Sequence, residues 1–483
     1  MKIKLFNSRK NAICIKVLVF SLITFACTSN GTENEINEIR PYEKNAYYWE
    51  YKGKPTVLIG GTKQDNLFNF PEGLAGHLDT LKAVGGNYIR NTMSSRDSGN
   101  VWPYVRLENG LFDLDKWNDE YWNRLDNLLK LTNDRNIIVQ IEIWDPWDYF
   151  ISNDNHRLWA IHPFNPNNNI NYTLAESNLK NDINFRPKAE PTSHNFFHTV
   201  PQLENNKVVL KYQQAFVSRI LEVGFAYPNV LYCLSNELGE PIDWSTYWAE
   251  YIHHQADNHG KKVQVADMRR DNNIHTGDHV YLQNHPELFT FLDISQNNGG
   301  SDWDRPEQRH WDPIIKVRNY IADNPRPMNN TKIYGSGESS RGGEKQAIQK
   351  FWRSIFATCA SVRFHRPPAG LGLCGSAQIQ IKSMSMFIDE IDIFSCHPRN
   401  DLLQERQPNE AYCLAKPGEI YAIYFTDGGE VKLNSSQFES DATIKWLDIQ
   451  NSKWIEPEKP RGKDMINIKA PGLNGWIAVV QVN

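Results

Sequence analysis

The stretch Val230-Leu-Tyr-Cys-Leu-Ser-Asn-Glu237 is an apolar run of strand length that ends in a polar pair. A short run rich in branched and aromatic residues is typical of a buried strand. Seven further runs of this kind occur in the chain, so the sequence holds eight candidate strands. They are Thr56 to Gly60, Asn87 to Thr92, Ile137 to Trp144, Val230 to Ser235, Val263 to Ala266, Phe291 to Ser295, Lys332 to Gly335 and Ser361 to His365.

Amphipathic helical stretches separate these runs. Leu74, Leu78 and Leu81, for example, fall on one face of a helix. Strands that alternate with helices are typical of an α/β fold with a parallel sheet. Eight such units between residues 45 and 400 predict a (β/α)8 TIM barrel, and a doubly wound sheet is the alternative that shares the same alternation.

Two segments depart from this alternation. After residue 408 short alternating strands surround the turn Asp427-Gly428-Gly429, which predicts a small antiparallel β-sandwich over residues 408–483. Residues 145–207 have no sustained period, but they are too aromatic for a disordered linker, so we expect a folded lid or cleft wall. Their aromatic residues include Trp159, Phe164, Tyr172, Phe196 and Phe197.

Residues 1–26 begin with basic residues and continue with an apolar run, Val17 to Ala26. This run is shorter than the roughly 20 residues that span a bilayer, so it predicts a signal peptide. Thr24-Phe-Ala-Cys27 resembles a bacterial lipoprotein signal, in which the Cys is lipidated and starts the mature chain. Residues 27–44 predict a flexible tether. We expect export, either as an outer-membrane or cell-surface lipoprotein anchored through Cys27 or as a periplasmic protein.

The composition narrows the classes of function. The 483 residues are 40% hydrophobic, enough for a large core, and the mean hydropathy of -0.58 argues against several membrane spans. The formal charge of -5 becomes -10 from Cys27 onward, because five Lys and Arg but no acid precede that residue. An acidic chain of this kind disfavours nucleic acid as a partner.

The sequence predicts neither a metal nor an organic cofactor. The five cysteines that follow Cys27 show no CxxC spacing, and His194 and His198 lie in an irregular segment without the Glu of a zinc motif. Gly370-Leu-Gly-Leu-Cys-Gly375 fits the GxGxxG pattern of dinucleotide sites. Pro367-Pro368, however, interrupts the strand-to-helix turn that such a site requires.

Two carboxylates stand where a barrel forms its active site, at the C-terminal ends of strands. Glu237 ends the fourth predicted strand and Glu338 follows the seventh. A pair of carboxyl groups about 5 to 5.5 Å apart carries out retaining glycoside hydrolysis, whereas about 6.5 to 9.5 Å indicates the inverting reaction. We predict Glu237 as the acid/base and Glu338 as the nucleophile, with inversion as the alternative mechanism.

Other residues at the strand ends are candidate sugar ligands. Asn236 would donate to a hydroxyl beside the anomeric carbon. Trp144, Asp145 and Trp147 end the third strand; sugar rings stack on indole and their hydroxyls bind carboxylates, while core packing is the alternative for both indoles. His365, with the arginine that follows it, would line a subsite for an acidic sugar, and structural pairing is its alternative.

On the basis of these strand-end residues, the region from residue 45 to residue 400 resembles the clan A glycoside hydrolases. In that clan an Asn-Glu pair on strand four carries the acid/base and a Glu on strand seven is the nucleophile, which match Asn236-Glu237 and Glu338. Arg90 matches the arginine that the clan places beneath the nucleophile. The resemblance implies that its guanidinium keeps that carboxylate ionised and oriented, and a structural salt bridge is the alternative.

A narrower resemblance is to apiosidase-like lipoproteins of gut and marine Bacteroidetes, which end in a β-sandwich labelled collagen-binding. It rests on Tyr51-Lys-Gly-Lys-Pro-Thr-Val-Leu-Ile-Gly-Gly-Thr62 and on Trp446-Leu-Asp-Ile-Gln-Asn-Ser-Lys-Trp454. It implies a retaining glycosidase that acts on plant or algal polysaccharides or on oligosaccharides derived from them. The alternative is a surface glycan-binding lipoprotein without catalysis, although a binder has no need of two close carboxylates that repel one another.

Overall fold

The computed structural model describes residues 37–97, 99–149, 158–180, 194–298, 307–334, 343–460 and 464–483. The predicted signal peptide, residues 1–26, lies outside the described residues, and so does the predicted nucleophile Glu338. Among the helices that are described, none has both the length and the hydropathy needed to cross a membrane.

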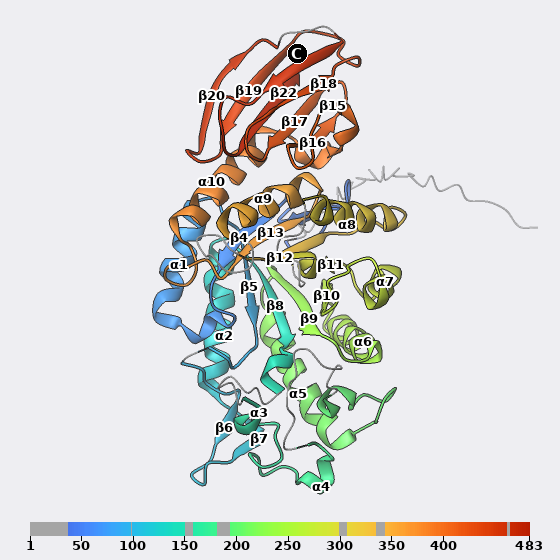
Figure 1. The fold of residues 1–483 in the computed structure, drawn as a ribbon. Coiled ribbons are helices and arrows are strands. Elements are labelled where there is room, and N and C mark those ends of the chain that lie inside the picture. The colour runs from blue at the N-terminus through green and yellow to red at the C-terminus, as the bar shows by residue number, and fades with distance from the viewer. Residues whose placement is uncertain are drawn as a thin grey trace, which may run out of the picture. The chain divides into compact units, whose positions relative to one another are not determined.

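Eight parallel strands form one barrel-like sheet, which confirms the fold class predicted from the sequence (Figure 1). Neighbours in the sheet follow chain order, and a hydrogen bond from Phe291 N to Val265 O (3.4 Å) links the fifth and sixth strands. The strands are β4 (Leu58–Thr62), β5 (Tyr88–Thr92), β8 (Ile138–Trp144), β9 (Val230–Leu238), β10 (Val265–Arg269), β11 (Leu292–Asp293), β12 (Met328–Tyr334) and β13 (Ser361–His365).

Two of these strands are longer than their apolar runs predict. β9 continues three residues beyond Ser235, and β12 begins four residues before Lys332. The early part of β12 is polar, but its side chains are buried: Asn329 Nδ2 donates to Gln140 Oε1 at 3.2 Å, and Thr331 Oγ1 donates to Asp293 Oδ2 at 3.1 Å. Hydrogen bonds across the barrel and to the adjacent strand thus replace the apolar contacts that a sequence pattern detects.

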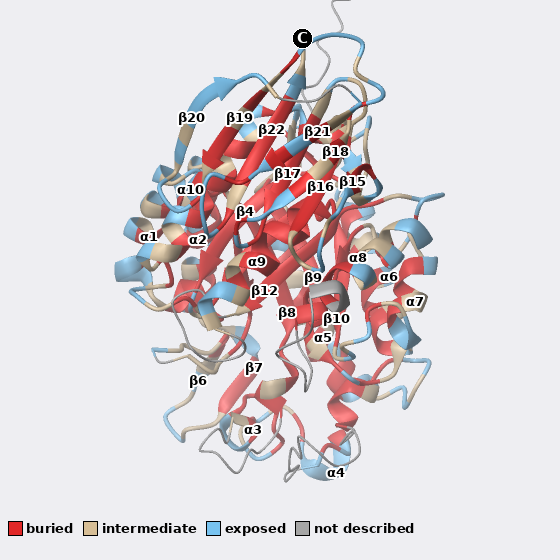
Figure 2. Cartoon of the chain, turned by 45° about the horizontal axis from the view of Figure 1, so that its top comes forward, coloured by how far each residue is buried: buried red, intermediate tan, exposed pale blue. Residues whose placement is uncertain are grey.

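Helices connect the strands and cover the outside of the sheet, with their buried faces turned toward it (Figures 1 and 2). In one of them, α2, the side chain of Asn118 caps the first turn by accepting from Glu120 N at 3.2 Å, while Leu125, Leu128 and Leu129 are fully buried. The helices are α1 (Pro71–Ala83), α2 (Asp119–Asp134), α5 (Lys207–Gly224), α6 (Ile242–Asn258), α7 (Gly277–Asn284), α8 (Glu307–Tyr320), α9 (Gly343–Phe356) and α10 (Gly375–Glu390).

A three-stranded antiparallel sheet packs against the N-terminal ends of the barrel strands. It consists of β1 (Arg40–Pro41), β2 (Trp49–Tyr51) and β3 (Lys54–Thr56). Its residues Trp49 and Tyr51 share one core cluster with the first residues of the strands, such as Leu58 and Tyr88, and the Trp49 indole donates to Asn329 Oδ1 at 3.0 Å. This sheet closes the end of the barrel at which the strands begin.

The described part of the insertion 145–207 is folded, and Figure 1 shows its short helices near the hairpin β6–β7 (Tyr104–Arg106 and Phe112–Trp117). Backbone hydrogen bonds join the two: Phe112 N donates to Asn168 O at 2.7 Å, and Ile170 N donates to Phe112 O at 3.0 Å. The insertion contains η2 (Pro146–Tyr149), α3 (Leu158–Ile161), α4 (Leu174–Ser177) and η3 (Asn195–His198). The five aromatic residues that the sequence analysis names in it are at most 3% exposed: Trp159, Phe164, Tyr172, Phe196 and Phe197.

The C-terminal region consists of two antiparallel sheets that share one core (Figure 2). A six-stranded sheet has the order β14-β16-β17-β22-β19-β20, and a three-stranded sheet has the order β15-β18-β21. Their strands are β14 (His397–Pro398), β15 (Leu403–Gln404), β16 (Ala411–Lys416), β17 (Ile420–Phe425), β18 (Glu430–Asn434), β19 (Ala442–Asp448), β20 (Lys453–Glu458), β21 (Met465–Lys469) and β22 (Trp476–Val482).

Candidate active site

The predicted pair Asn236-Glu237 belongs to β9 and stands near its C-terminal end. Glu237 has a φ of 65°, in the left-handed region that residues with a Cβ seldom adopt. Such a conformation persists only where its surroundings hold it, and it occurs often at functional sites. Among the carboxylates of the barrel that the structure describes, the backbone therefore singles out Glu237.

The Glu237 carboxylate is held by donors from two other parts of the barrel. Lys332 Nζ lies 2.6 Å from Glu237 Oε1 and also donates to Asn236 Oδ1. The Gln296 side chain, from η4 (Ser295–Asn298), also forms a hydrogen bond with Glu237. Burial alone would raise the pKa of Glu237, but Lys332, Gln296 and Arg90 together lower it to about 2. The carboxylate is therefore ionised in this arrangement.

Asn236 and Asp145, which the sequence proposed as sugar ligands, lie in direct contact. Asn236 Nδ2 donates to Asp145 Oδ1 at 3.2 Å, and Arg96 Nη2 lies 2.6 Å from Asp145 Oδ2. Burial raises the pKa of Asp145, and the charge of Arg96 opposes this effect. Glu237, Asn236 and Asp145 thus form one continuous polar group at the ends of β8 and β9.

Arg90 on β5 is 1% exposed and is paired with two carboxylates. Its Nε lies 2.7 Å from Glu142 Oε1, and its Nη1 lies 3.5 Å from Asp65 Oδ1. Thr92 Oγ1 accepts from Arg90 Nη2 and donates to Glu142 Oε2, each at 2.8 Å. Burial disfavours the charge of Arg90, but the two carboxylates raise its pKa above the ordinary value, so the guanidinium is charged and fixed in place.

Asp65, which follows β4, gathers three arginines at the same end of the barrel. Besides Arg90, Arg96 Nη2 lies 3.2 Å and Arg366 Nη2 lies 2.6 Å from Asp65 Oδ2. Burial would raise the pKa of Asp65, but the three guanidinium groups hold it well below its usual range. This carboxylate fixes the arginines that line the mouth of the barrel.

His365 is 2% exposed at the end of β13 and lies between arginines. Its Nδ1 is 3.3 Å from Arg90 Nη1 and 3.3 Å from Arg363 Nη1, and its ring meets Tyr334 edge to face at 4.5 Å between centroids. Burial and the neighbouring cations hold the pKa of His365 well below its ordinary value, so the ring is neutral. These contacts correspond to the structural pairing that was the alternative to a sugar contact.

The two indoles at the end of β8 lie in different surroundings. Trp144 is 1% exposed and packs against Phe196, Phe216 and Trp248, with ring centroids 5.4 to 5.6 Å apart. Its faces are therefore occupied by other rings, and we leave Trp144 out of the proposed sugar site. Trp147 is half-buried, and its backbone N donates to Asp145 Oδ1 at 3.2 Å. Of the two, only Trp147 offers surface beside Asp145.

The predicted nucleophile Glu338 lies outside the described residues, so its separation from Glu237 stays a prediction. β12, which precedes it, ends at Tyr334. Lys332 on this strand contacts Glu237, and Tyr334 contacts His365. The described end of the seventh strand thus reaches this polar group through Lys332 and the end of the eighth strand through Tyr334.

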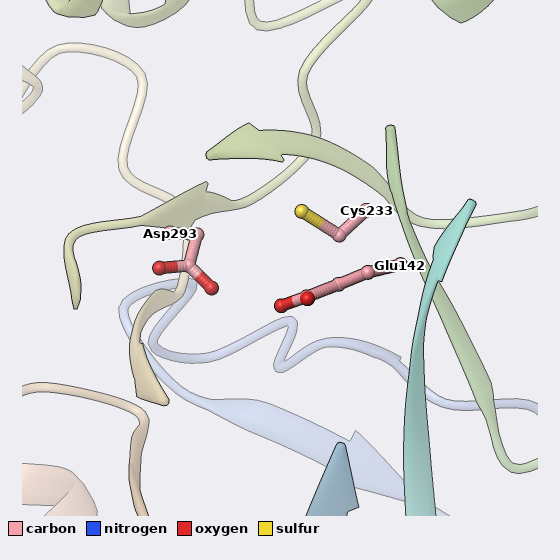
Figure 3. Close-up of side chains that lie close together, drawn as sticks. All are labelled: Glu142, Cys233 and Asp293. Carbon is pink, nitrogen blue, oxygen red and sulfur yellow. The ribbon is translucent and has the colours of Figure 1, made fainter. Parts of the chain in front are cut away.

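One buried cluster in the barrel interior has the donor atoms of a metal site. Glu142, Cys233 and Asp293 place their carboxylate and thiol atoms within 4.8 Å of one another, facing inward from different strands (Figure 3). Arg90 and Thr92 already bind the Glu142 carboxylate, and the Cys233 thiol donates to Ser235 O at 3.3 Å. Burial raises the pKa of Cys233 well above its ordinary value, which disfavours the thiolate that binds metals. The chemistry of these donors therefore fits a packed polar interior better than a metal site.

The sequence analysis missed four side chains that organise the site: Lys332, Gln296, Asp65 and Arg96. A charged residue inside the strand Met328–Tyr334 is a detectable signal, because buried lysines are rare without a partner. Asp65, Arg96 and Gln296 follow strand ends within runs of other polar residues, and nothing in their spacing distinguishes them from surface residues. Only the closed barrel brings them together.

Comparison with solved structures finds glycoside hydrolases that share the fold of this chain. A glycoside hydrolase family 5 protein from Bacteroides vulgatus is 13% identical, covers 92% of this chain and 93% of its own, and has a TM-score of 0.59. Another protein described as a glycoside hydrolase is 12% identical over 92% of this chain and 97% of its own, with a TM-score of 0.60. At such identities the likeness establishes a shared fold. No protein-family model and no curated protein matches the chain.

A more distant match has the same barrel architecture. The α-amylase of Geobacillus thermoleovorans, complexed with acarbose, is 10% identical, covers 88% of this chain and 98% of its own, and has a TM-score of 0.54. The structural neighbours are thus TIM-barrel glycoside hydrolases. In chemical terms, the mouth of this barrel presents an ionised carboxylate, the amide groups of Asn236 and Gln296, and fixed guanidinium groups.

Proposed function

We propose that this protein is a retaining glycoside hydrolase, with Glu237 as acid/base and Glu338 as nucleophile. The observation that carries the proposal is the conformation of Glu237, a left-handed residue near the end of β9 whose carboxylate is only 22% exposed. Backbone strain at an ionisable residue in the mouth of a barrel is typical of a catalytic site. The fold of the structural neighbours supports the same class of reaction.

The remaining residues suit recognition of a sugar. Asn236 and Asp145 would bind hydroxyls beside the reacting carbon, Trp147 would stack on the ring, and Arg90 would hold Glu338 ionised. His365 would act through Arg90 and not by direct contact. This reaction needs no metal or organic cofactor. The substrate class we propose is a plant or algal polysaccharide or an oligosaccharide derived from one.

We further propose that the chain is exported and anchored to a membrane through a lipid on Cys27. The support is the basic and apolar sequence before that residue. Labelling cells with a radioactive fatty acid tests this: the wild-type protein should carry label, and the Cys27→Ala variant should not. Label in the variant, or none in the wild type, would contradict the anchor.

The direct test of the reaction is hydrolysis of polysaccharides and aryl glycosides by the wild type, Glu237→Ala and Glu338→Ala, each with and without azide. We expect azide to restore turnover, with a product of retained configuration for Glu237→Ala and of inverted configuration for Glu338→Ala. Full activity in both variants would exclude this assignment. Tight glycan binding without turnover by the wild type would instead favour the non-catalytic binding lipoprotein.

A further inference from the structure

Lys332 is the closest charged partner of Glu237, and nothing in the proposed reaction requires a lysine there. Its side chain is 3% exposed, and its Nζ reaches both Glu237 Oε1 and Asn236 Oδ1. It comes from the middle of β12, so the closure of the barrel sets its position. One ammonium thus binds both members of the Asn-Glu pair.

Among the residues that the structure describes, the partners that bind the Glu237 carboxylate are donors. Lys332 and Gln296 bind it, and Arg90 adds a positive charge nearby. A carboxyl group that is to give up a proton needs an acceptor or an apolar surface beside it, as raised carboxyl pKa values require. The surroundings of Glu237 have the opposite character.

Other charged groups act on this pair from every neighbouring strand end, and they nearly balance one another. The cations are Arg90 on β5, Arg96 after it and Arg366 after β13, and the anions are Asp65 after β4 and Asp145 after β8. His365 on β13 is neutral. Arg90 is also paired with Glu142. Among the described cations, Lys332 is therefore the one that contacts Glu237 directly.

We infer that Lys332 is a positioning residue that fixes the Glu237 carboxylate, together with Asn236, as a proton acceptor in the resting site. The inference rests on the proposed function of Glu237. With Glu237 ionised, the resting site is in the protonation state that the second half of the reaction requires. There an O–H bond of water breaks, the water oxygen bonds to the anomeric carbon as the bond to Glu338 breaks, and the proton passes to Glu237.

The first half of the reaction needs the opposite state, in which Glu237 donates a proton to the leaving oxygen. Because the pKa of Glu237 is lowered to about 2, the ion pair with Lys332 is complete above the ordinary pKa of a Glu and is lost as the pH falls through about 2. The free enzyme therefore favours substrates whose leaving group needs little protonation. Aryl glycosides should be cleaved far faster than alkyl glycosides near neutral pH.

The test measures the protonation of Glu237 directly, by pH-difference infrared spectroscopy of the whole protein. The signal of Glu237 is the part of the wild-type spectrum that Glu237→Gln lacks. In the wild type we expect Glu237 to take up no proton between about pH 8 and pH 4. In Lys332→Met, which removes the neighbouring positive charge, we expect the midpoint of Glu237 protonation to lie about 1 to 3 pH units higher than in the wild type. Lys332→Arg, which keeps the cation, should resemble the wild type, as should the control Lys345→Met on α9.

Equal midpoints in the wild type and Lys332→Met would overturn the inference. If Lys332→Met does not fold, the infrared midpoint of Glu237 in the wild type tests the inference. Protonation of Glu237 above about pH 5 would exclude an ion pair with Lys332. Kinetics give a second measurement: in Lys332→Met the fall of kcat/KM for alkyl glycosides should move to higher pH. The Glu237 midpoint could be higher in Lys332→Met while the wild type hydrolyses no glycoside. That result would keep Lys332 as the partner of Glu237 and reject the proposed reaction.

Discussion

The barrel and the C-terminal sandwich both enclose a core between β-strands, but the barrel core contains charged and polar side chains and the sandwich core is mainly apolar. Gln140, Glu142, Asp293 and Arg363 are all at most 2% exposed inside the barrel. Among the described residues of the sandwich, those that are polar and buried are Thr426 and Ser435, and neither carries a charge. A polar interior is stable only when each group has a partner, and the barrel supplies those partners across its axis. From this difference we expect the chemistry to take place in the barrel and the sandwich to act as a support.

The contacts of the sandwich agree with that division. Its Tyr424 ring lies 5.8 Å from Trp352 and 5.6 Å from Phe356, both on α9, between centroids. Ser383 Oγ on α10 donates to Ile449 O at 2.7 Å. These contacts cover the outer helices of the barrel, whereas the polar group around Glu237 lies at the strand ends. Four predictions follow, in order of decreasing effect on the free energy of unfolding.

Glu142→Ala should have the largest effect, because it leaves the buried guanidinium of Arg90 without its closest carboxylate. Breaking a buried ion pair costs about 3 to 5 kcal/mol. Urea denaturation of the wild type and the variant measures this loss, and Glu142→Gln, which keeps the volume and a hydrogen bond to Thr92, should cost less. A loss below about 1 kcal/mol would mean that the barrel tolerates an unpaired charge, and the contrast between the two interiors would fail.

Leu433→Ala should test the sandwich in the same way. Leu433 is fully buried in the shared core, and a Leu to Ala change at such a site costs about 2 to 5 kcal/mol through lost burial and the cavity left behind. The matched control is Leu473→Ala, since Leu473 is 78% exposed. Calorimetry should show a lower Tm only for Leu433→Ala. A change in kcat at 25 °C for folded Leu433→Ala would contradict the role of the sandwich as a support.

His198 should contribute in a pH-dependent way to the folded insertion. Its Nε2 lies 3.1 Å from Glu240 Oε2, and this hydrogen bond raises the pKa of His198. A raised pKa means that the stabilisation is complete below the pKa of the unfolded chain, about 6.5, and is lost as the pH rises through the folded value. The difference in stability between the wild type and His198→Gln should be about 1 kcal/mol at pH 6 and should vanish in alkaline solution. A difference that grows with pH would show that the charged pair is not formed.

Lys345→Ala should have the smallest effect. Lys345 Nζ lies 2.6 Å from Asp427 Oδ2, which joins α9 to the sandwich, but the two side chains are 66% and 49% exposed. Exposed pairs of this kind contribute about 0 to 1 kcal/mol. Thermal denaturation at low and at high salt should give nearly the same Tm for the wild type and the variant. A large loss would mean that this contact, and not the aromatic packing of Tyr424, holds the sandwich to the barrel.

The sequence predicted the strands of the barrel well, because their apolar residues form short, separate runs. It also placed Asn236 and Glu237 correctly at a strand end, where polarity changes abruptly. It failed at the polar half of β12, whose Asn329 and Thr331 are buried by partners that are distant in sequence. It could not distinguish Trp144 from Trp147, because an aromatic residue at a strand end packs or stacks according to neighbours that only the fold supplies.

The most direct test of the central claim compares Glu237→Gln with Leu433→Ala in two assays, hydrolysis of a glycoside that the wild type cleaves and thermal denaturation. If the barrel mouth carries the chemistry and the sandwich supports the fold, folded Glu237→Gln should lose about 10²- to 10⁴-fold in kcat on an alkyl glycoside at 25 °C. Leu433→Ala should keep kcat at 25 °C and lose Tm. Wild-type kcat in Glu237→Gln, or equal loss of kcat in both variants, would contradict the account.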